Sequence, residues 1–232
     1  MAWNFGVQIN SLTGFDGNLD SASEEGDNYT TLANQWLNDA AREVINILPD
    51  DLKEKCITST TLNNSTPTLD LDTDGSNPIG KIISVLRERT DSGPYVECMK
   101  VPLSKSSEVT DSTSMYYASA TNPVYYVDSL SDSSKLNVYP TPTSTQNAIV
   151  HHIGYPTVDH SHSDIANFPN EAEYLVPLRA AITALEYKLN FEEDIDLYIN
   201  MIDNLKNRYE KGILALQTGK MYTPKKKDKD DD

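Results

Sequence analysis

The sequence predicts an α+β protein in which a helical bundle, made of one N-terminal helix and a C-terminal antiparallel helical hairpin, carries an inserted antiparallel β-rich domain. Three observations lead to this fold class. Apolar residues recur every three or four positions between residues 30 and 48, and again between 168 and 217, as in helices with one buried face. From 55 to 162 the period changes to two, and β-branched and aromatic residues fall in short runs separated by turn residues. The chain has 232 residues, which is long enough to bury a core without disulfides.

Residues 1 to 28 are expected to form a flexible N-terminal arm. They are rich in Gly, Ser, Asn and Asp, and their apolar residues are too sparse for a core. An arm of this kind can become ordered by docking on a neighbouring subunit, because only then does burial offset the entropy lost on ordering. Trp3 and Phe5 are therefore candidate interface residues.

Residues 29 to 50 are expected to contain the first helix, which begins near residue 30. A proline at position 49 ends it, because the residue before a proline is biased away from helical conformation. The main apolar stripe has a spacing of four. It consists of Leu32, Trp36, Ala40, Val44 and Leu48.

Residues 51 to 166 are expected to form the β-rich insertion. Glycine and proline in the segments 72–78 and 91–94 predict turns. Short strands at this spacing indicate an antiparallel sheet or a small sandwich inserted between helices. The candidate strands are 56–62, 81–89, 95–101, 124–128, 136–139 and 148–155.

Residues 167 to 218 are expected to form the helical hairpin, with one helix over about 168–190 and another over about 194–217. Pro177 lies inside the first of these, so a kink or a shallow first turn is expected there. The connection between the two helices is short, and they should therefore run antiparallel. Residues 219 to 232 are expected to be a disordered charged tail.

The chain is strongly acidic, with a net charge of −16. The four Lys and four Asp of residues 225 to 232 cancel, so the acidity belongs to the rest of the chain. Adhesive DNA binding depends on clusters of Lys and Arg, and this composition disfavours it. An acidic surface would instead let DNA slide past without sticking. The sequence also has no apolar run long enough to span a membrane, and synthesis in a cytoplasm is expected.

No catalytic motif, cofactor motif or metal motif is present in the sequence, and a non-enzymatic protein without cofactors is predicted. His160 and His162, together with Asp159, are the best candidates for a metal site, because alternate residues of a strand share a face. We favour a solvated strand end for this cluster. Asp70, Asp72 and Asp74 resemble half of a calcium loop, but the closing glutamate is missing.

Cysteine and tyrosine are two further residue types that could form a site. Cys56 and Cys98 have no metal or disulfide spacing, and they are predicted to be buried small hydrophobes. The tyrosines are concentrated in the insertion, where core packing competes with an interface role. The interface candidates among them are Tyr116, Tyr117, Tyr125 and Tyr126.

The chain resembles the head-to-tail connector (adaptor, or neck) proteins of tailed bacteriophages. The resemblance rests on the helix Trp-Leu-Asn-Asp-Ala-Ala-Arg-Glu-Val-Ile-Asn-Ile-Leu-Pro at 36–49, followed by a polar β insertion. It continues with Phe-Pro-Asn-Glu-Ala-Glu-Tyr-Leu-Val at 168–176, which opens a helical hairpin. The middle segments 94–98, 120–126 and 136–142 look like segments of phage virion proteins. The insertion is larger than in the purely helical adaptors.

The resemblance implies a structural virion protein, made in the host cytoplasm and located in the neck or tail. Its subunits would form a ring, commonly of twelve, between the portal protein and the tail or tail-terminator proteins. DNA would pass through the lumen during genome packaging and ejection without being bound specifically. The alternatives are a tail, baseplate or fibre-attachment subunit and, less favoured, a carbohydrate- or metal-binding module.

Overall fold

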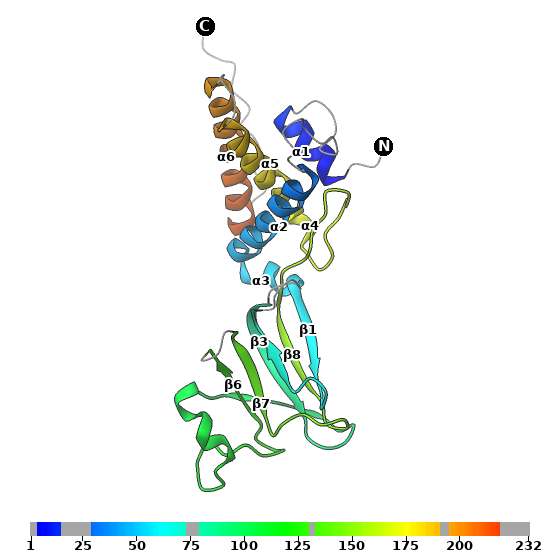
Figure 1. Cartoon of the computed structure of the whole chain (residues 1–232), viewed down its shortest axis with the longest axis vertical. Coiled ribbons are helices and arrows are strands. Elements are labelled where there is room, and N and C mark those ends of the chain that lie inside the picture. The colour runs from blue at the N-terminus through cyan, green and yellow to red at the C-terminus, as the bar shows by residue number, and fades with distance from the viewer. Residues whose placement is uncertain (1–3, 15–28, 73–78, 130–132, 191–194, 219–232) are drawn as a thin grey trace. The chain divides into compact units, whose positions relative to one another are not determined.

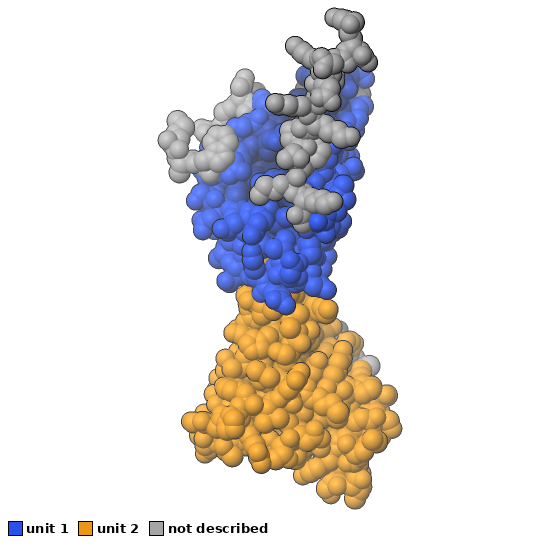
Figure 2. Space-filling view, turned by 180° about the vertical axis from the view of Figure 1, so that it is seen from behind, with its two compact units in different colours: residues 1–55, 156–232 blue, residues 56–155 orange. Residues whose placement is uncertain are grey.

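A computed structural model describes residues 4–14, 29–72, 79–129, 133–190 and 195–218 (Figure 1). The chain divides into two compact units (Figure 2). Residues 1–55 with 156–232 form one, which we call the helical unit, and residues 56–155 form the other, which we call the β unit. Together they give a mixed α+β protein.

The helical unit is organised around α5. This helix contacts α1, α2 and α6, and it is buried along much of its length. Ala180, Ala181 and Ala184 are fully or almost fully buried on it, and their small side chains allow neighbouring helices to approach closely. The helices are α1 (Phe5–Thr13), α2 (Tyr29–Ile47), α3 (Asp50–Lys53), α4 (Asn170–Glu173), α5 (Leu175–Leu189) and α6 (Ile195–Thr218).

Three side chains connect the longest helices. Glu43 on α2 accepts a hydrogen bond from Arg179 Nε on α5 at 2.7 Å and another from the Tyr209 hydroxyl on α6 at 3.2 Å. Burial, reinforced by the nearby Glu43 carboxylate, raises the pKa of Tyr209, so its hydroxyl remains protonated and able to donate. The position of α2 is thereby tied to both α5 and α6.

Pro177 lies in the first turn of α5, and not in the middle of a long helix. The segment expected to be one helix from 168 is divided at Tyr174 into α4 and α5. The missing N–H of a proline matters little in a first turn, because the amides there have no partner inside the helix. Of the two expectations, a kink or a shallow first turn, the structure shows a break in the helix before the proline.

The expectation of a flexible arm is wrong for residues 5–13, which form α1. Asn4 caps this helix by accepting a hydrogen bond from the Val7 amide at 2.8 Å, and Gly14 ends it with a φ of 70°. Phe5 and Ile9 are buried at its inner face, and α1 packs on α5. Because Phe5 is buried within its own chain, it is not available as an interface residue. Trp3, residues 15–28 and the tail 219–232 lie outside the described residues.

The β unit contains two four-stranded sheets, ordered β1-β8-β3-β4 and β2-β7-β6-β5. Among the described strands, β5 and β6 form the one parallel pair, which corrects the expectation of a purely antiparallel insertion. The strands are β1 (Ile57–Leu62), β2 (Thr68–Asp70), β3 (Ile79–Glu88), β4 (Tyr95–Glu97), β5 (Met99–Lys100), β6 (Val124–Asp128), β7 (Lys135–Tyr139) and β8 (Ala148–Gly154).

Both sheets contribute to one core, and Cys98 marks the crossing between them. The strand expected over 95–101 is interrupted there, so β4 joins one sheet and β5 the other. Cys98 and Cys56 are both buried and free, as their lack of spacing predicted. The shared core consists of Leu62, Leu69, Val85, Cys98, Leu136, Val138, Ala148 and Val150.

The chain enters the β unit on β1 and leaves it on β8. These strands are antiparallel neighbours, with Ile57 opposite Ile153. The two ends of the unit therefore lie side by side. None of the described helices is both long and apolar enough to cross a membrane.

Candidate functional site

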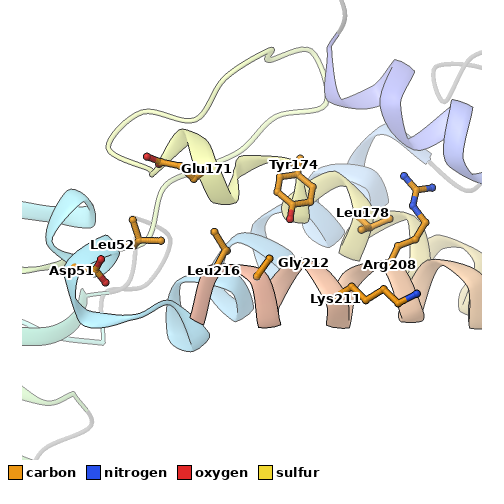
Figure 3. A pocket seen from close by; sticks show the side chains of 10 residues that line it. Asp51, Leu52, Glu171, Tyr174, Leu178, Arg208, Lys211, Gly212 and Leu216 are labelled. Carbon is orange, nitrogen blue, oxygen red and sulfur yellow. The ribbon is translucent and has the colours of Figure 1, made fainter. Parts of the chain in front are cut away.

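The helical unit has a groove of about 790 Å³ between α3, α4, α5 and α6 (Figure 3). Apolar side chains form most of its floor and charged side chains form its two ends. We call it the helical groove. Its lining residues are Asp51, Leu52, Glu171, Tyr174, Leu178, Arg208, Lys211, Gly212, Ala215 and Leu216.

A glycine shapes the middle of this groove. A Cβ atom at Gly212 would lie 2.6 Å from Leu175 Cδ2 and 2.6 Å from the Tyr174 hydroxyl, so a larger residue would displace one of them. Gly212 thus lets the Tyr174 ring approach α6, as the close view shows (Figure 3). The Tyr174 side chain is nevertheless 50% exposed. Burial of the remainder raises the pKa of Tyr174, so its hydroxyl is neutral and can donate or accept a hydrogen bond.

The two ends of the helical groove carry opposite charges. Asp51 and Glu171 lie at one end, and Arg208 and Lys211 lie at the other (Figure 3). Lys55 holds Glu171 with contacts of 2.9 and 3.0 Å, and this hydrogen bond lowers the pKa of the Glu171 carboxyl. Arg208 is exposed. The groove can therefore receive an apolar segment, and its oppositely charged ends favour one orientation of a segment that is itself charged.

A second, smaller hollow of about 390 Å³ lies on the β unit. The register of β3 against β8 slips between Ile82 and Ser84, which is a β-bulge at Ile83. Ile83 is 46% exposed, and Met99 on β5, which lines the same hollow, is 42% exposed. Tyr125 also lines it. Exposed apolar side chains around a bulge are typical of a contact surface.

The histidine cluster predicted as a candidate metal site lies in the loop that holds α1. The His160 and His162 carbonyls accept hydrogen bonds from the Gly6 and Phe5 amides at 2.8 and 2.9 Å. The His160 ring lies 3.1 Å from Asn34 Oδ1, and Asp159 accepts a hydrogen bond from Asn34 Nδ2 at 2.9 Å. In the part of the chain that the structure describes, no group of three or more His, Cys, Asp or Glu side chains could hold a metal ion.

The acidic run that resembles half of a calcium loop helps to hold a loop of the β unit. Asp72 Oδ2 accepts a hydrogen bond from the Ser134 amide at 2.6 Å, and this bond lowers the pKa of Asp72. Asp70 accepts a hydrogen bond from the Asp72 amide at 3.0 Å. Asp74 lies outside the described residues. The two described carboxylates are thus engaged by backbone amides.

The tyrosine interface candidates have different environments. Tyr126 stacks on Tyr139 with ring centroids 5.8 Å apart, and burial raises the pKa of Tyr126 to about 12. Tyr116 packs against a small core formed by Val101 and its neighbours, and Tyr125 packs against the shared core of the two sheets. Tyr117 is 41% exposed. Tyr117 is therefore accessible at the surface, and Tyr125 lines the hollow of the β unit.

The sequence reasoning missed the helical groove. The available signal was Gly212, since a glycine in the interior of a helix lowers helix stability and usually has a packing reason. Its partner Tyr174 is distant in the sequence, and nothing in the local pattern links the two residues. The half-buried Ala215 on α6 gives no signal by itself.

A family model described as SU10 adaptor protein matches residues 16–225. This range contains the whole β unit and most of the helical unit, and α1 lies outside it. No curated protein matches the chain.

Proposed function

This chain belongs to the SU10 adaptor protein family of phage structural proteins, and from this premise we propose that it is a head-to-tail connector subunit. In the proposal, copies of the chain form a closed ring between the portal protein and the tail or tail-terminator proteins. The ring has twelve subunits and sits in the neck of the virion. DNA passes through its lumen during packaging and ejection.

The main support for the proposal is the extent of the family match, which covers residues 16–225 and so contains all of the β unit and most of the helical unit. An adaptor has to contact two different neighbours, and a chain with two separate compact units offers a surface for each. Membership of a structural adaptor family also implies a non-enzymatic role.

The charge of the chain supports a conduit for DNA. A net charge of −16 makes sequence-independent attachment to phosphates unfavourable, because such binding depends on Lys and Arg that release counterions. DNA must move through a neck rapidly in both directions. A lumen that repels it suits this task better than one that grips it.

Electron microscopy of the purified protein tests the proposal. We expect rings with a central hole and twelve-fold symmetry, and a native mass of twelve chains. The protein should also bind to purified portal rings of the same phage. Particles that are monomers or trimers at every concentration, with no binding to the portal, would overturn the connector assignment.

The alternative structural assignment is a tail, baseplate or fibre-attachment subunit. The observation that favours it is the exposed hollow at Ile83 and Met99 on the β unit, which suits a contact with another tail protein. Labelled antibodies on intact virions distinguish the two assignments. Label at the neck supports the connector, and label at the distal end of the tail supports the alternative.

A further inference from the structure

We propose that the helical groove is a subunit contact and that its occupant is the first turns of α6 from a second copy of this chain. This inference rests on the proposed ring, and it names the surface that builds that ring. The groove has an apolar floor with acidic and basic ends, so it requires a segment with an apolar ridge and a charged flank. Helices commonly bind in such grooves through residues spaced by three or four.

The first turns of α6 present such a ridge. Leu197 is 54% exposed, and Met201 is half-buried one turn later on the same stripe of the helix. Ile199 is 42% exposed nearby. Covering the exposed half of this leucine with a partner is favourable, because it removes apolar surface from water. The ridge is thus an apolar surface left open in the isolated chain.

The charges around the ridge complement those of the groove. Asp196 and Asp203 are exposed beside it, whereas Arg208 and Lys211 form the basic end of the groove. Two copies that each carry a charge of −16 repel one another over most orientations. When the ridge docks at the basic end of the groove, the carboxylates beside the ridge are attracted by the basic side chains. Complementary charges of this kind select the register of a contact.

The first turns of α6 cannot occupy the groove of their own chain. Leu197 and Ala215 lie on the same helix, and at 1.5 Å per residue they are separated by about 27 Å along its axis. The contact therefore joins two different patches on two copies, which is a head-to-tail arrangement. Each pair leaves one free ridge and one free groove, so further copies can add, and a ring forms when the rotation between neighbouring copies closes. This is the type of contact that a closed ring requires.

Disulfide trapping tests the contact in the full-length protein. Leu197→Cys is combined with Ala215→Cys, one on the ridge and one in the groove. A disulfide needs Cα atoms within about 7 Å, so a bond between these positions has to join two chains. The natural Cys56 and Cys98 are buried, and burial raises the pKa of their thiols to about 11 and about 12, which keeps them unreactive.

The expected result is a ladder of covalent oligomers on a non-reducing gel, removed by reductant. Each single cysteine variant should give no ladder beyond dimers. The matched control combines Leu197→Cys with Glu210→Cys, an exposed residue that the helical repeat places on the side of α6 away from Arg208 and Ala215. Because Glu210 lies outside the groove, this pair should cross-link at least tenfold more slowly.

A charge exchange provides a second, independent test. Arg208→Glu or Asp196→Lys alone should weaken assembly by about tenfold or more, as expected for a like-charge contact in an interface. The two substitutions together should restore most of it. Arg89→Glu on the β unit makes the same change in net charge as Arg208→Glu, at an exposed residue outside both hollows, and should leave assembly unchanged.

The outcomes separate this inference from the proposed function. Rings without a ladder, and without rescue by the charge exchange, would overturn the groove contact and leave the connector assignment standing. A ladder in a protein that never closes into rings would support the contact and overturn the ring. Absence of both the ladder and any assembly would overturn both.

Discussion

Arg87 is a single buried residue on which an irregular segment of the β unit depends. Its side chain, 2% exposed, donates to the carbonyls of Pro140 at 2.6 Å and Glu88 at 2.7 Å, and to Gln146 Oε1 at 3.2 Å. Burial lowers the pKa of Arg87, but a guanidinium keeps its charge at any ordinary pH. The segment after β7 is therefore fastened to β3 by one charged side chain.

Arg87→Met should lower the free energy of unfolding by roughly 2–4 kcal/mol, because each buried acceptor left unpaired costs about 1–3 kcal/mol. The measurement is equilibrium unfolding in urea. Arg89→Met removes the same group from an exposed position two residues along and should change stability by less than about 0.5 kcal/mol. Equal losses in the two variants would show that the buried hydrogen bonds do not stabilise the fold.

The two cysteines predict a loss of stability in alkali. Burial raises the pKa of Cys56 from 9.0 to about 11 and that of Cys98 from 9.0 to about 12. The unfolded chain therefore releases these protons at a lower pH than the folded chain. Their contribution is complete below pH 9 and is lost as the pH rises from there through the folded pKa values. Each thiol adds a decline of about 1.4 kcal/mol per pH unit in that window.

Urea midpoints at pH 7.5, 9 and 10 measure this decline. In the Cys56→Ala, Cys98→Ala double variant the slope between pH 9 and 10 should be clearly shallower than in the natural protein. The comparison uses slopes and not absolute stabilities, because the small cavities left by the substitutions lower stability at every pH. Identical slopes would mean that the buried thiols ionise at the same pH in both states.

At the scale of elements, α1 is a helix stabilised by its surroundings more than by its own sequence. Ile9→Ala should cost about 2–4 kcal/mol, because Ile9 is 0% exposed against the rest of the helical unit. Deleting residues 1–14 should destabilise the protein at least as much. Thermal and urea unfolding measure both changes, with Ser11→Ala as an exposed control on the same helix. A deletion that leaves stability unchanged would restore the interpretation of these residues as a docking arm.

The same element shows what the sequence could and could not predict. The helices around Trp36 and Ile182 and the strand around Val150 repeat their apolar spacing over many residues, so the pattern alone predicts them. The buried face of α1 has only two large apolar residues, Phe5 and Ile9, beside Gly6 and Thr13, and the surface that covers them comes from distant parts of the chain. Such a helix has no local signal strong enough to distinguish it from an arm.

The shorter strands and the helical groove also depend on residues that are distant in the sequence. Strand β2 has only three residues, and its pairing with β7 stabilises it. The parallel pairing of β5 depends on the crossing of the chain between the sheets at Cys98. The groove depends on Gly212 and Tyr174 meeting across two helices. Features made by long-range packing cannot be read from periodicity, because periodicity reports only which face of one element is buried.

At the scale of the whole molecule, the β unit is an insertion whose ends meet. Because Ile57 and Ile153 are paired across β1 and β8, their Cα atoms are only about 5 Å apart. A short link can therefore replace everything between them without moving the flanking chain. Insertions of this kind are tolerated when the host unit keeps its own core, and here α5 and its neighbours provide one.

We accordingly expect each unit to fold without the other. A chain in which residues 57–153 are replaced by Gly-Ser-Gly should keep its helical circular dichroism and unfold cooperatively, and residues 56–155 alone should fold as a β protein. Replacing β3 with a flexible segment, as a control, should unfold the β unit, because β3 pairs with both β8 and β4. Loss of helicity on excision would show that the units stabilise one another.

The excised chain also separates assembly from folding. The helical groove and the ridge at Leu197 both belong to the helical unit, so this unit alone should still form closed rings, while the isolated β unit should remain monomeric. Native mass spectrometry of the two proteins measures this directly. If the helical unit folds but stays monomeric, the subunit contacts come from the β unit, and its exposed hollow at Ile83 and Met99 then becomes the surface on which assembly depends.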